Sequence, residues 1–274
     1  MLHLFQRVAA HICTLQRPTL TAARRGLHTR ISVKHSVSYR PLIWGSALAL
    51  SAAVAVGSSV HLDADVPPQG DTTTDPATAI TFPNKLRIQS KTPLPTFTLV
   101  GVGVRTVSFI GLKVYSIGFY ADLDNPNLNI SKSASLEEKL DHIVRNSACV
   151  LRIMPTRSTS YGHLRDGFIR ALQKRMVFCR QRGTLSPEEE AAVQSPFRKF
   201  KSMFPNTPLT KHTPLDILLT PPEAGQERTL VVRDLGAVQN DWLAREFVLT
   251  YFEGDGLSPP LKQSVAQRLE SFGK

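Results

Sequence analysis

Residues 99–121, LVGVGVRTVSFIGLKVYSIGFYA, combine a long β-branched and aromatic run with a charged side chain, Arg105, inside its first half. Apolar residues continue on both sides of Ile110-Gly111, which indicates two strands joined by a tight turn. A dinucleotide-binding fingerprint would need a third glycine where this chain has Thr106, and a helix directly after it. The pattern therefore predicts a β-hairpin rather than a phosphate-binding loop.

Other short apolar runs bounded by turn residues predict further strands. They lie at 80–88, 148–155, 215–220 and 228–235. The last two flank a Pro-Glu-Ala-Gly turn and are expected to form a second hairpin.

Helical spacing of apolar residues, usually behind a capping residue, predicts five helices. They are expected after Ser135, within 158–182, after Ser186, over 241–252 and after Ser258. Gly183 is expected to end the second helix, and Pro196 to break or kink the third. Hairpins precede clustered helices, which predicts an α+β domain over 80–274, with a largely antiparallel sheet and helices packed on one face.

The first 40 residues hold seven Lys and Arg, and the first acidic residue of the chain is Asp63. This composition is typical of a mitochondrial presequence, with a disordered basic tail as the alternative. The formal net charge of +11 falls to +4 once these seven are set aside, which leaves no nucleic-acid-binding signal.

Residues 41–60 include nineteen uncharged residues, Leu42–Val60, just long enough to cross a bilayer. Basic residues precede them and Asp63 follows, so a retained segment would anchor the chain in the inner mitochondrial membrane with the domain facing the intermembrane space. A cleaved sorting signal is the alternative. Residues 61–79, rich in Pro, Thr and Asp, are interpreted as a flexible linker.

The three cysteines show none of the spacings of a zinc site or of covalent haem attachment. No Ser/His/Asp order or metalloprotease motif is present either. Three residues stand out on their own chemistry. Arg105 must face water or meet an anionic or carbonyl partner. Tyr161 and His163 lie near the start of a helix, where the helix dipole favours an anion, although ordinary surface roles explain both.

The motif VGVGVRTVSFIGLKVYSIGFYA resembles the opening hairpin of the chalcone isomerase fold family, in which Gly-x-Gly-x-Arg precedes a glycine turn and an Ile-Gly-x-Tyr strand. LRIMPTRSTSYGHLRDGF resembles the strand and tyrosine-bearing helix start of that family, and QNDWLAREFVLTYFEGDGLSPPLKQSVAQRL its C-terminal helices. The likeness spans about residues 80–272 and implies an open-faced sandwich. With the N-terminal segments, the chain is similar to the fungal mitochondrial branch named for altered inheritance of mitochondria.

The resemblance implies a set of cleft residues. Arg105 matches the arginine that stabilises a developing carbonyl anion in the plant enzymes. Tyr161 matches the tyrosine that orders a water, and Thr250 matches a hydroxyl near the far ring. The family's cleft threonine, lysine and asparagine fall at Tyr115, near Arg152 and at Phe168. Aromatic residues at two of these positions would fill or reshape a flavonoid cleft.

The resemblance therefore implies a protein that binds a flat, apolar, anionic ligand and lacks plant-type isomerase activity. Haem is the expected ligand, with Arg105 or Arg152 on a propionate, Tyr115 and Phe168 as aromatic walls and His163 as an axial ligand. The alternatives are an intramolecular lyase that uses Arg105 and Tyr161, a fatty-acid-binding protein and a scaffold. No zinc, nucleotide or nucleic acid is expected.

Overall fold

The computed structural model describes residues 71–90, 92–107 and 111–273. The predicted presequence (1–40), the hydrophobic segment (41–60) and residues 61–70 of the predicted linker lie outside this range. Within it, no helix has both the length and the apolar character needed to span a bilayer.

A seven-stranded sheet forms the centre of the domain, and every neighbouring pair in it is antiparallel. Across the sheet, the order is β11 (Gly236–Gln239), β10 (Thr229–Val232), β9 (Leu215–Leu219), β6 (Cys149–Pro155), β5 (Leu112–Ala121), β4 (Phe97–Val107) and β3 (Lys85–Leu86). Both predicted hairpins are confirmed, and β11 is an additional strand that the apolar pattern missed.

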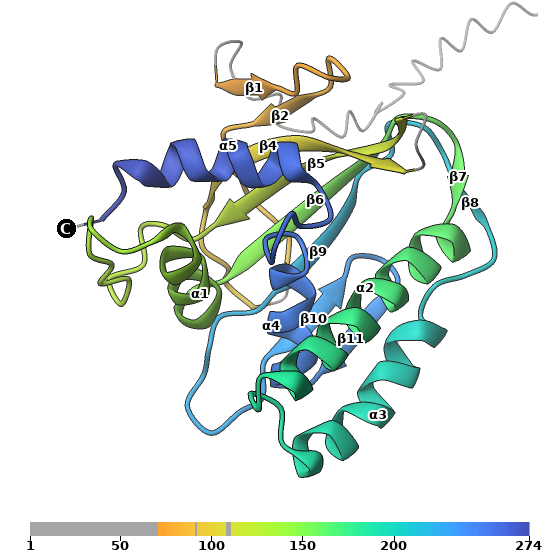
Figure 1. Cartoon of the computed structure of the whole chain (residues 1–274). Helices are drawn as coiled ribbons and strands as arrows, with labels where there is room; N and C mark the ends of the chain where they lie inside the picture. The colour runs from red at the N-terminus through yellow and green to blue at the C-terminus, as the bar shows by residue number, and fades with distance from the viewer. Residues whose placement is uncertain (1–70, 91, 108–110, 274) are drawn as a thin grey trace, which may run out of the picture. The chain divides into compact units, whose positions relative to one another are not determined.

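Five helices cover one face of this sheet (Figure 1). They are α1 (Leu136–Asn146), α2 (Tyr161–Gln181), α3 (Pro187–Ser202), α4 (Asp241–Leu249) and α5 (Pro259–Glu270). Ser135 and Ser186 each form a capping box with the glutamate three residues later, as expected from the sequence for Ser135. The predicted α+β architecture, with helices on one face of an antiparallel sheet, is confirmed.

The helix α3 continues through Pro196, so the expected break does not occur, and the alternative expectation of a kink stays a prediction. Proline removes one backbone hydrogen bond and ordinarily bends a helix. Here Val193 and Phe200, one on each side of Pro196, are both buried in the main core. We attribute the continuity of the helix to this packing.

The opposite face of the sheet is covered by a small second hydrophobic cluster that contains no helical residue. A hairpin of β1 (Thr72–Thr74) and β2 (Thr81–Pro83) lies over it and contributes Phe82. The turn of this hairpin holds Asp75, which is 1% exposed and accepts hydrogen bonds from Ser116 (2.6 Å) and Thr78 (2.8 Å).

Residues 71–79 therefore belong to the folded domain, and the predicted boundary at residue 80 is wrong for this part. These residues show no apolar periodicity, which is why their sequence predicts a flexible linker. Polar hydrogen bonds to the sheet, rather than an apolar stripe, hold them in place.

A third pairing, β7 (Thr159–Ser160) with β8 (Pro208–Leu209), connects the start of α2 to the segment after α3. The Tyr161 backbone N–H donates to the Thr207 carbonyl beside it (3.1 Å). This pairing fixes the N-terminal end of α2 over the sheet, next to the β4–β5 hairpin.

Candidate ligand-binding site

The glycines before Arg105 allow α5 to lie directly on β4. A Cβ atom at Gly103 would overlap the Leu261 backbone, and one at Gly101 would lie 2.7 Å from Val265 Cγ2. The pair thus serves close helix–sheet packing, not phosphate binding. Two further hydrogen bonds join this segment to β4. The Ser258 hydroxyl, just before α5, donates to the Val104 carbonyl, and the Val102 N–H donates to the Ser264 hydroxyl of α5.

Arg105 lies on the helix-covered face of the sheet. It is paired across the strands with Tyr115, and residues directly opposite each other share a face. The Arg105 side chain is half-buried, and its Nη1 donates to the Leu257 carbonyl at 3.4 Å, a long hydrogen bond. Within the described part of the chain it forms no ion pair. Its charge is therefore only weakly compensated by the protein.

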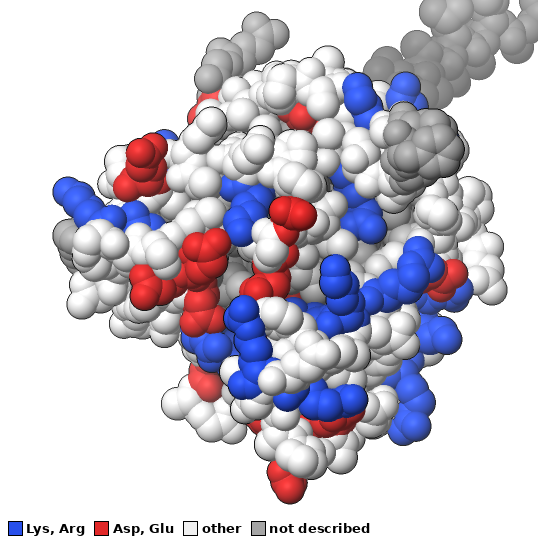
Figure 2. All heavy atoms as spheres, in the orientation of Figure 1, with Lys and Arg blue, Asp and Glu red and all other residues white. Residues whose placement is uncertain are grey.

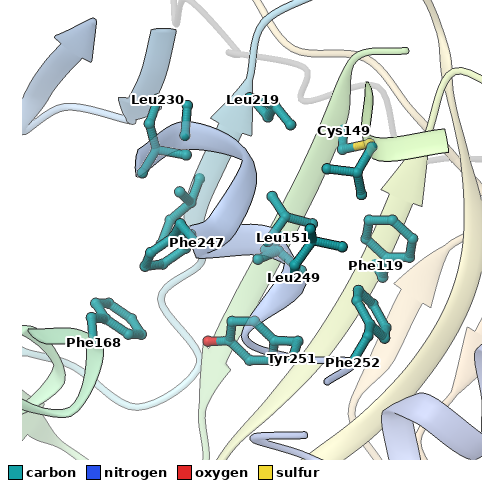
Figure 3. Packing of buried hydrophobic residues seen from close by; sticks show 14 of the residues in the cluster. Phe119, Cys149, Leu151, Phe168, Leu219, Leu230, Phe247, Leu249, Tyr251 and Phe252 are labelled. Carbon is teal, nitrogen blue, oxygen red and sulfur yellow. The ribbon is translucent and has the colours of Figure 1, made fainter. Parts of the chain in front are cut away.

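Tyr115 is buried beside Arg105 and is hydrogen-bonded to a second buried phenol. The Tyr115 and Tyr251 hydroxyl oxygens are 2.9 Å apart. Burial raises the pKa of Tyr115 above 10.0, with the Arg105 charge acting in the opposite direction, and burial likewise raises the pKa of Tyr251. Figure 3 shows Tyr251 in the core, with its hydroxyl directed toward the side on which Phe168 lies.

A cavity of about 30 Å³ lies between the β4–β5 hairpin and α2. Its walls are Arg105, Val107, Val114 and Tyr115 from the hairpin, and His163, Leu164, Gly167, Phe168 and Arg170 from α2. Four of the predicted ligand-binding residues thus meet at one place. The volume suffices for about one water molecule.

The aromatic wall of this cavity is part of the core. Phe168 stacks edge-on against Phe247 (centroids 5.2 Å apart) and contacts Phe204 (5.9 Å). Because Phe247 belongs to α4 and Phe204 follows α3, core packing closes the cavity on that side. His163, in contrast, is exposed at the mouth of the cavity, on the first turn of α2.

A second, larger cleft of about 380 Å³ follows α2 toward its C-terminal end. It is lined by Ala171, Lys174, Arg175, Phe178, Thr250, Glu253, Gly254, Asp255, Gly256 and Leu257. Leu257, one of these residues, supplies the carbonyl to which Arg105 donates, whereas Arg105 itself lines the cavity and not the cleft. The Thr250 hydroxyl donates to the Phe247 carbonyl at 2.6 Å.

The structure does not bring Arg152 to this place. Arg152 pairs across the strands with Gly118 and Asp216 and lies on the opposite face of the sheet. Its guanidinium forms a two-point ion pair with Asp216 (2.7 and 2.9 Å), and Arg233 contacts the same carboxylate at 3.2 Å. Arg152 is therefore paired with a carboxylate of the protein itself.

Tyr161 begins α2 and is half-buried against the main core, but it lines neither the cavity nor the cleft. Sequence reasoning missed Tyr251, Leu257 and Arg170. Tyr251 lies near the end of the amphipathic 241–252 segment and is a polar aromatic residue within an apolar run, which is a signal that could have found it. The role of the Leu257 carbonyl has no sequence signal, because any residue supplies a backbone carbonyl.

Comparison with known proteins bears on this geometry. A family model described as "Chalcone isomerase like" matches residues 95–142 and 123–266. The chain belongs to the chalcone isomerase-like family. The predicted family is thereby confirmed, and the matched region includes the β4–β5 hairpin, α2 and α4.

Fungal relatives fit the predicted mitochondrial branch. An uncharacterised protein of Schizosaccharomyces pombe is 35% identical over 125 residues, 39% of this chain and 44% of that one. "Altered inheritance of mitochondria protein 18, mitochondrial" is 33% identical in Debaryomyces hansenii (33% and 39% covered) and 23% in Lachancea thermotolerans (78% and 76% covered). The chain spans less than half the length of the first two.

A solved structure with the same fold is the Arabidopsis thaliana fatty-acid binding protein. It has a TM-score of 0.55 and 17% identity, and the match covers 73% of this chain and 98% of that one. This likeness confirms the fold. The fatty-acid binding named for that structure is stated of the Arabidopsis protein.

Proposed function

We propose that this chain is a mitochondrial binding protein for an apolar carboxylate, and that Arg105 binds the carboxylate. The observation that carries the proposal is the half-buried Arg105 guanidinium, which has one long bond to a carbonyl and no carboxylate partner in the described structure. A guanidinium in an apolar setting is strongly stabilised by a carboxylate, with which it forms two parallel hydrogen bonds.

The larger cleft offers space for the apolar body of such a ligand. Its volume of about 380 Å³ falls within the range of small-molecule sites, whereas the cavity beside Tyr115 is about tenfold too small. Ala171, Phe178 and Leu257 supply apolar surface, and the Leu257 carbonyl is hydrogen-bonded to Arg105. A ligand in the cleft would place its carboxylate at Arg105 in exchange for the Leu257 carbonyl.

Haem fits the described residues less well than an acyl chain. None of the residues that line the larger cleft is a histidine, cysteine, methionine or tyrosine, the side chains that ordinarily ligate haem iron. His163 borders the small cavity instead, which holds about one water molecule. Haem therefore stays an untested prediction, and the shared chemistry of both candidates is a carboxylate on an apolar body.

The intramolecular-lyase alternative needs Arg105 and Tyr161 on one substrate. Tyr161 lines neither space, and the aromatic pair Tyr115 and Tyr251 fills the position between the hairpin and α4. These placements favour binding over catalysis. Turnover of a chalcone that is lost in Arg105→Gln would support the lyase instead.

The location follows from the relatives and from the N-terminal sequence. The fungal relatives are named as mitochondrial, and the first 40 residues have the composition of a presequence. The uncharged segment Leu42–Val60 supports an inner-membrane anchor with the domain in the intermembrane space. Resistance to carbonate extraction, and protease access after rupture of the outer membrane only, are the expected results.

Ligand retention by the unit His61–Lys274, a compact body that contains both hydrophobic clusters, tests the proposed binding. We expect the purified protein to carry a carboxylate that mass spectrometry identifies in an organic extract. Arg105→Gln should lose it, while Arg87→Gln, at an exposed arginine after β3, should retain it.

The arms of this experiment separate the two carboxylate sources. A fatty acid in the extract supports the acyl ligand, and a Soret band in the absorption spectrum supports haem. A protein that carries neither, and that takes up neither when each is added, contradicts the proposal. Equal retention by Arg105→Gln would contradict the role of this residue.

A further inference from the structure

The exposed side of α2 carries cations that have no partner in the described structure. Arg170 and Lys174 lie one turn apart on this side, are exposed, and form no ion pair. Other cations of the same helix are paired: Arg165 with Asp166, Arg175 with Glu246, and Arg180 with Glu190. The two free cations are therefore not explained by internal electrostatics.

The neighbouring helix extends this charge. Arg198, Lys199 and Lys201 near the end of α3 are also exposed and form no ion pair in the described part of the chain. The pKa of Asp166 is lowered chiefly by its hydrogen bond with Arg165, with contributions from Arg170 on α2 and Lys201 on α3. Arg170 of α2 and Lys201 of α3 thus both lie near Asp166.

We call Arg170, Lys174, Arg198, Lys199 and Lys201 the α2–α3 basic surface. Figure 2 shows blue side chains gathered over these two helices, with a few red ones among them and a larger red group to their upper left. Val177 on α2 is the only large hydrophobic side chain that is exposed in the described structure, at 47%. A partner of this surface is therefore held by charge and not by deep apolar insertion.

We infer that the α2–α3 basic surface docks on an anionic phospholipid bilayer. Lysine and arginine side chains at a protein surface are attracted to the negative potential of such a bilayer. The surface lies along two adjacent helices, so several cations can approach one plane together (Figure 1). A bilayer presents many anionic headgroups in one plane and requires no matching shape.

The openings of the candidate ligand site favour a bilayer over an acidic protein, and this step rests on the proposed function. His163, Gly167 and Arg170 border the small cavity, and Ala171 and Lys174 border the larger cleft. Both spaces thus reach α2 beside the basic surface. Because apolar carboxylates partition into membranes, docking through this surface would bring the site to the phase that holds its ligand.

Sedimentation with lipid vesicles tests the docking without any bound ligand. The unit His61–Lys274 is mixed with vesicles of phosphatidylcholine alone or of phosphatidylcholine with phosphatidylserine. We expect binding to the anionic vesicles only, and a loss of binding as salt screens the charges. Each cation removed from the α2–α3 basic surface is expected to lower vesicle partitioning about fivefold.

Matched charge changes locate the surface. Arg170→Glu with Lys174→Glu should lower partitioning well over tenfold. Arg87→Glu with Arg268→Glu, at exposed residues after β3 and on α5, changes the net charge equally and should retain most of the binding. Thermal unfolding shows whether the charge-reversed variant is folded. If it is not, the milder Arg170→Gln with Lys174→Gln replaces it and should also lower vesicle partitioning.

Three outcomes would overturn the inference: no binding of the parent protein to anionic vesicles, an equal loss in both pairs of variants, or retention on immobilised polyglutamate with no vesicle binding. The last assigns the surface to an acidic protein. Because no ligand is present, a failed ligand assay leaves this result intact. Vesicle binding with no carboxylate in the protein would retain the docking and remove the proposed function.

Discussion

Each face of the sheet holds an arginine that the sequence suggested as a ligand contact, and the two guanidinium groups have different partners. Arg152 on the second face is paired with Asp216, which also contacts Arg233. Arg105 on the helix-covered face donates to the Leu257 carbonyl, lies beside the Tyr115 phenol and forms no ion pair with any residue that the structure describes. An arginine with a buried carboxylate partner contributes to the fold, whereas one that lacks such a partner is available to a ligand.

The largest expected effect concerns the paired arginine. Asp216→Ala leaves the Arg152 charge partly buried without a carboxylate and should lower the free energy of unfolding by about 3 kcal/mol. Urea unfolding of the unit His61–Lys274 measures this loss. A change below about 1 kcal/mol would show that the Arg152–Asp216 pair does not stabilise the fold and would contradict the contrast between Arg152 and Arg105.

A loss of similar or slightly smaller size is expected at the glycine under α5. Gly103→Ala places a methyl group against the Leu261 backbone and should destabilise the domain by about 2 kcal/mol. Gly167→Ala is the matched control, because a Cβ there meets no atom within 4 Å. Equal stability of both variants would mean that α5 shifts freely along β4.

The buried phenols predict an alkaline loss of stability. Burial raises the pKa of Tyr115 and of Tyr251 in the folded state, so the unfolded chain releases these protons first as pH rises above about 10. Their contribution is present below that pH and is lost above it. Urea unfolding at neutral and alkaline pH should show a smaller alkaline loss for Tyr115→Phe, which itself costs about 1 kcal/mol at neutral pH. An unchanged alkaline slope would contradict the assignment.

The smallest expected effect on stability belongs to Arg105. Arg105→Gln removes one long hydrogen bond and should change the free energy of unfolding by less than about 1 kcal/mol, while ligand retention is lost. Thermal and urea unfolding, measured beside the ligand assay, separate the two effects. A destabilisation as large as that of Asp216→Ala would place Arg105 among the structural arginines.

The five helices and the longer strands were predictable because each has a local signal, which β1 and β11 lack. The apolar run on both sides of Ile110-Gly111 gives the β4–β5 hairpin, and Ser135 with Glu138 gives the start of α1. The surroundings of Arg105 were not predictable from one sequence. A register irregularity falls between Arg105 and Thr106, and the side chain's face depends on that irregularity.

The contacts that decide which residues form the site are long-range. Tyr251 reaches Tyr115 across 136 positions, and Arg152 reaches Asp216 across 64. The resemblance to the chalcone isomerase fold family supplied Arg105, Tyr115, Phe168 and Thr250, which do border the cavity or the cleft. It could not supply the carboxylate that holds Arg152 on the other face.

The burial of Tyr115 also affects the rate at which the space beside Arg105 can fill. Its hydroxyl is paired with that of Tyr251, and the cavity that it lines between the hairpin and α2 has a volume of about 30 Å³. A ligand body would enter this cavity only while its walls are displaced, and association that waits for a rare open state is slow and lowers the apparent affinity by the open fraction. The larger cleft needs no such opening, so uptake through the cleft is the faster route to the site.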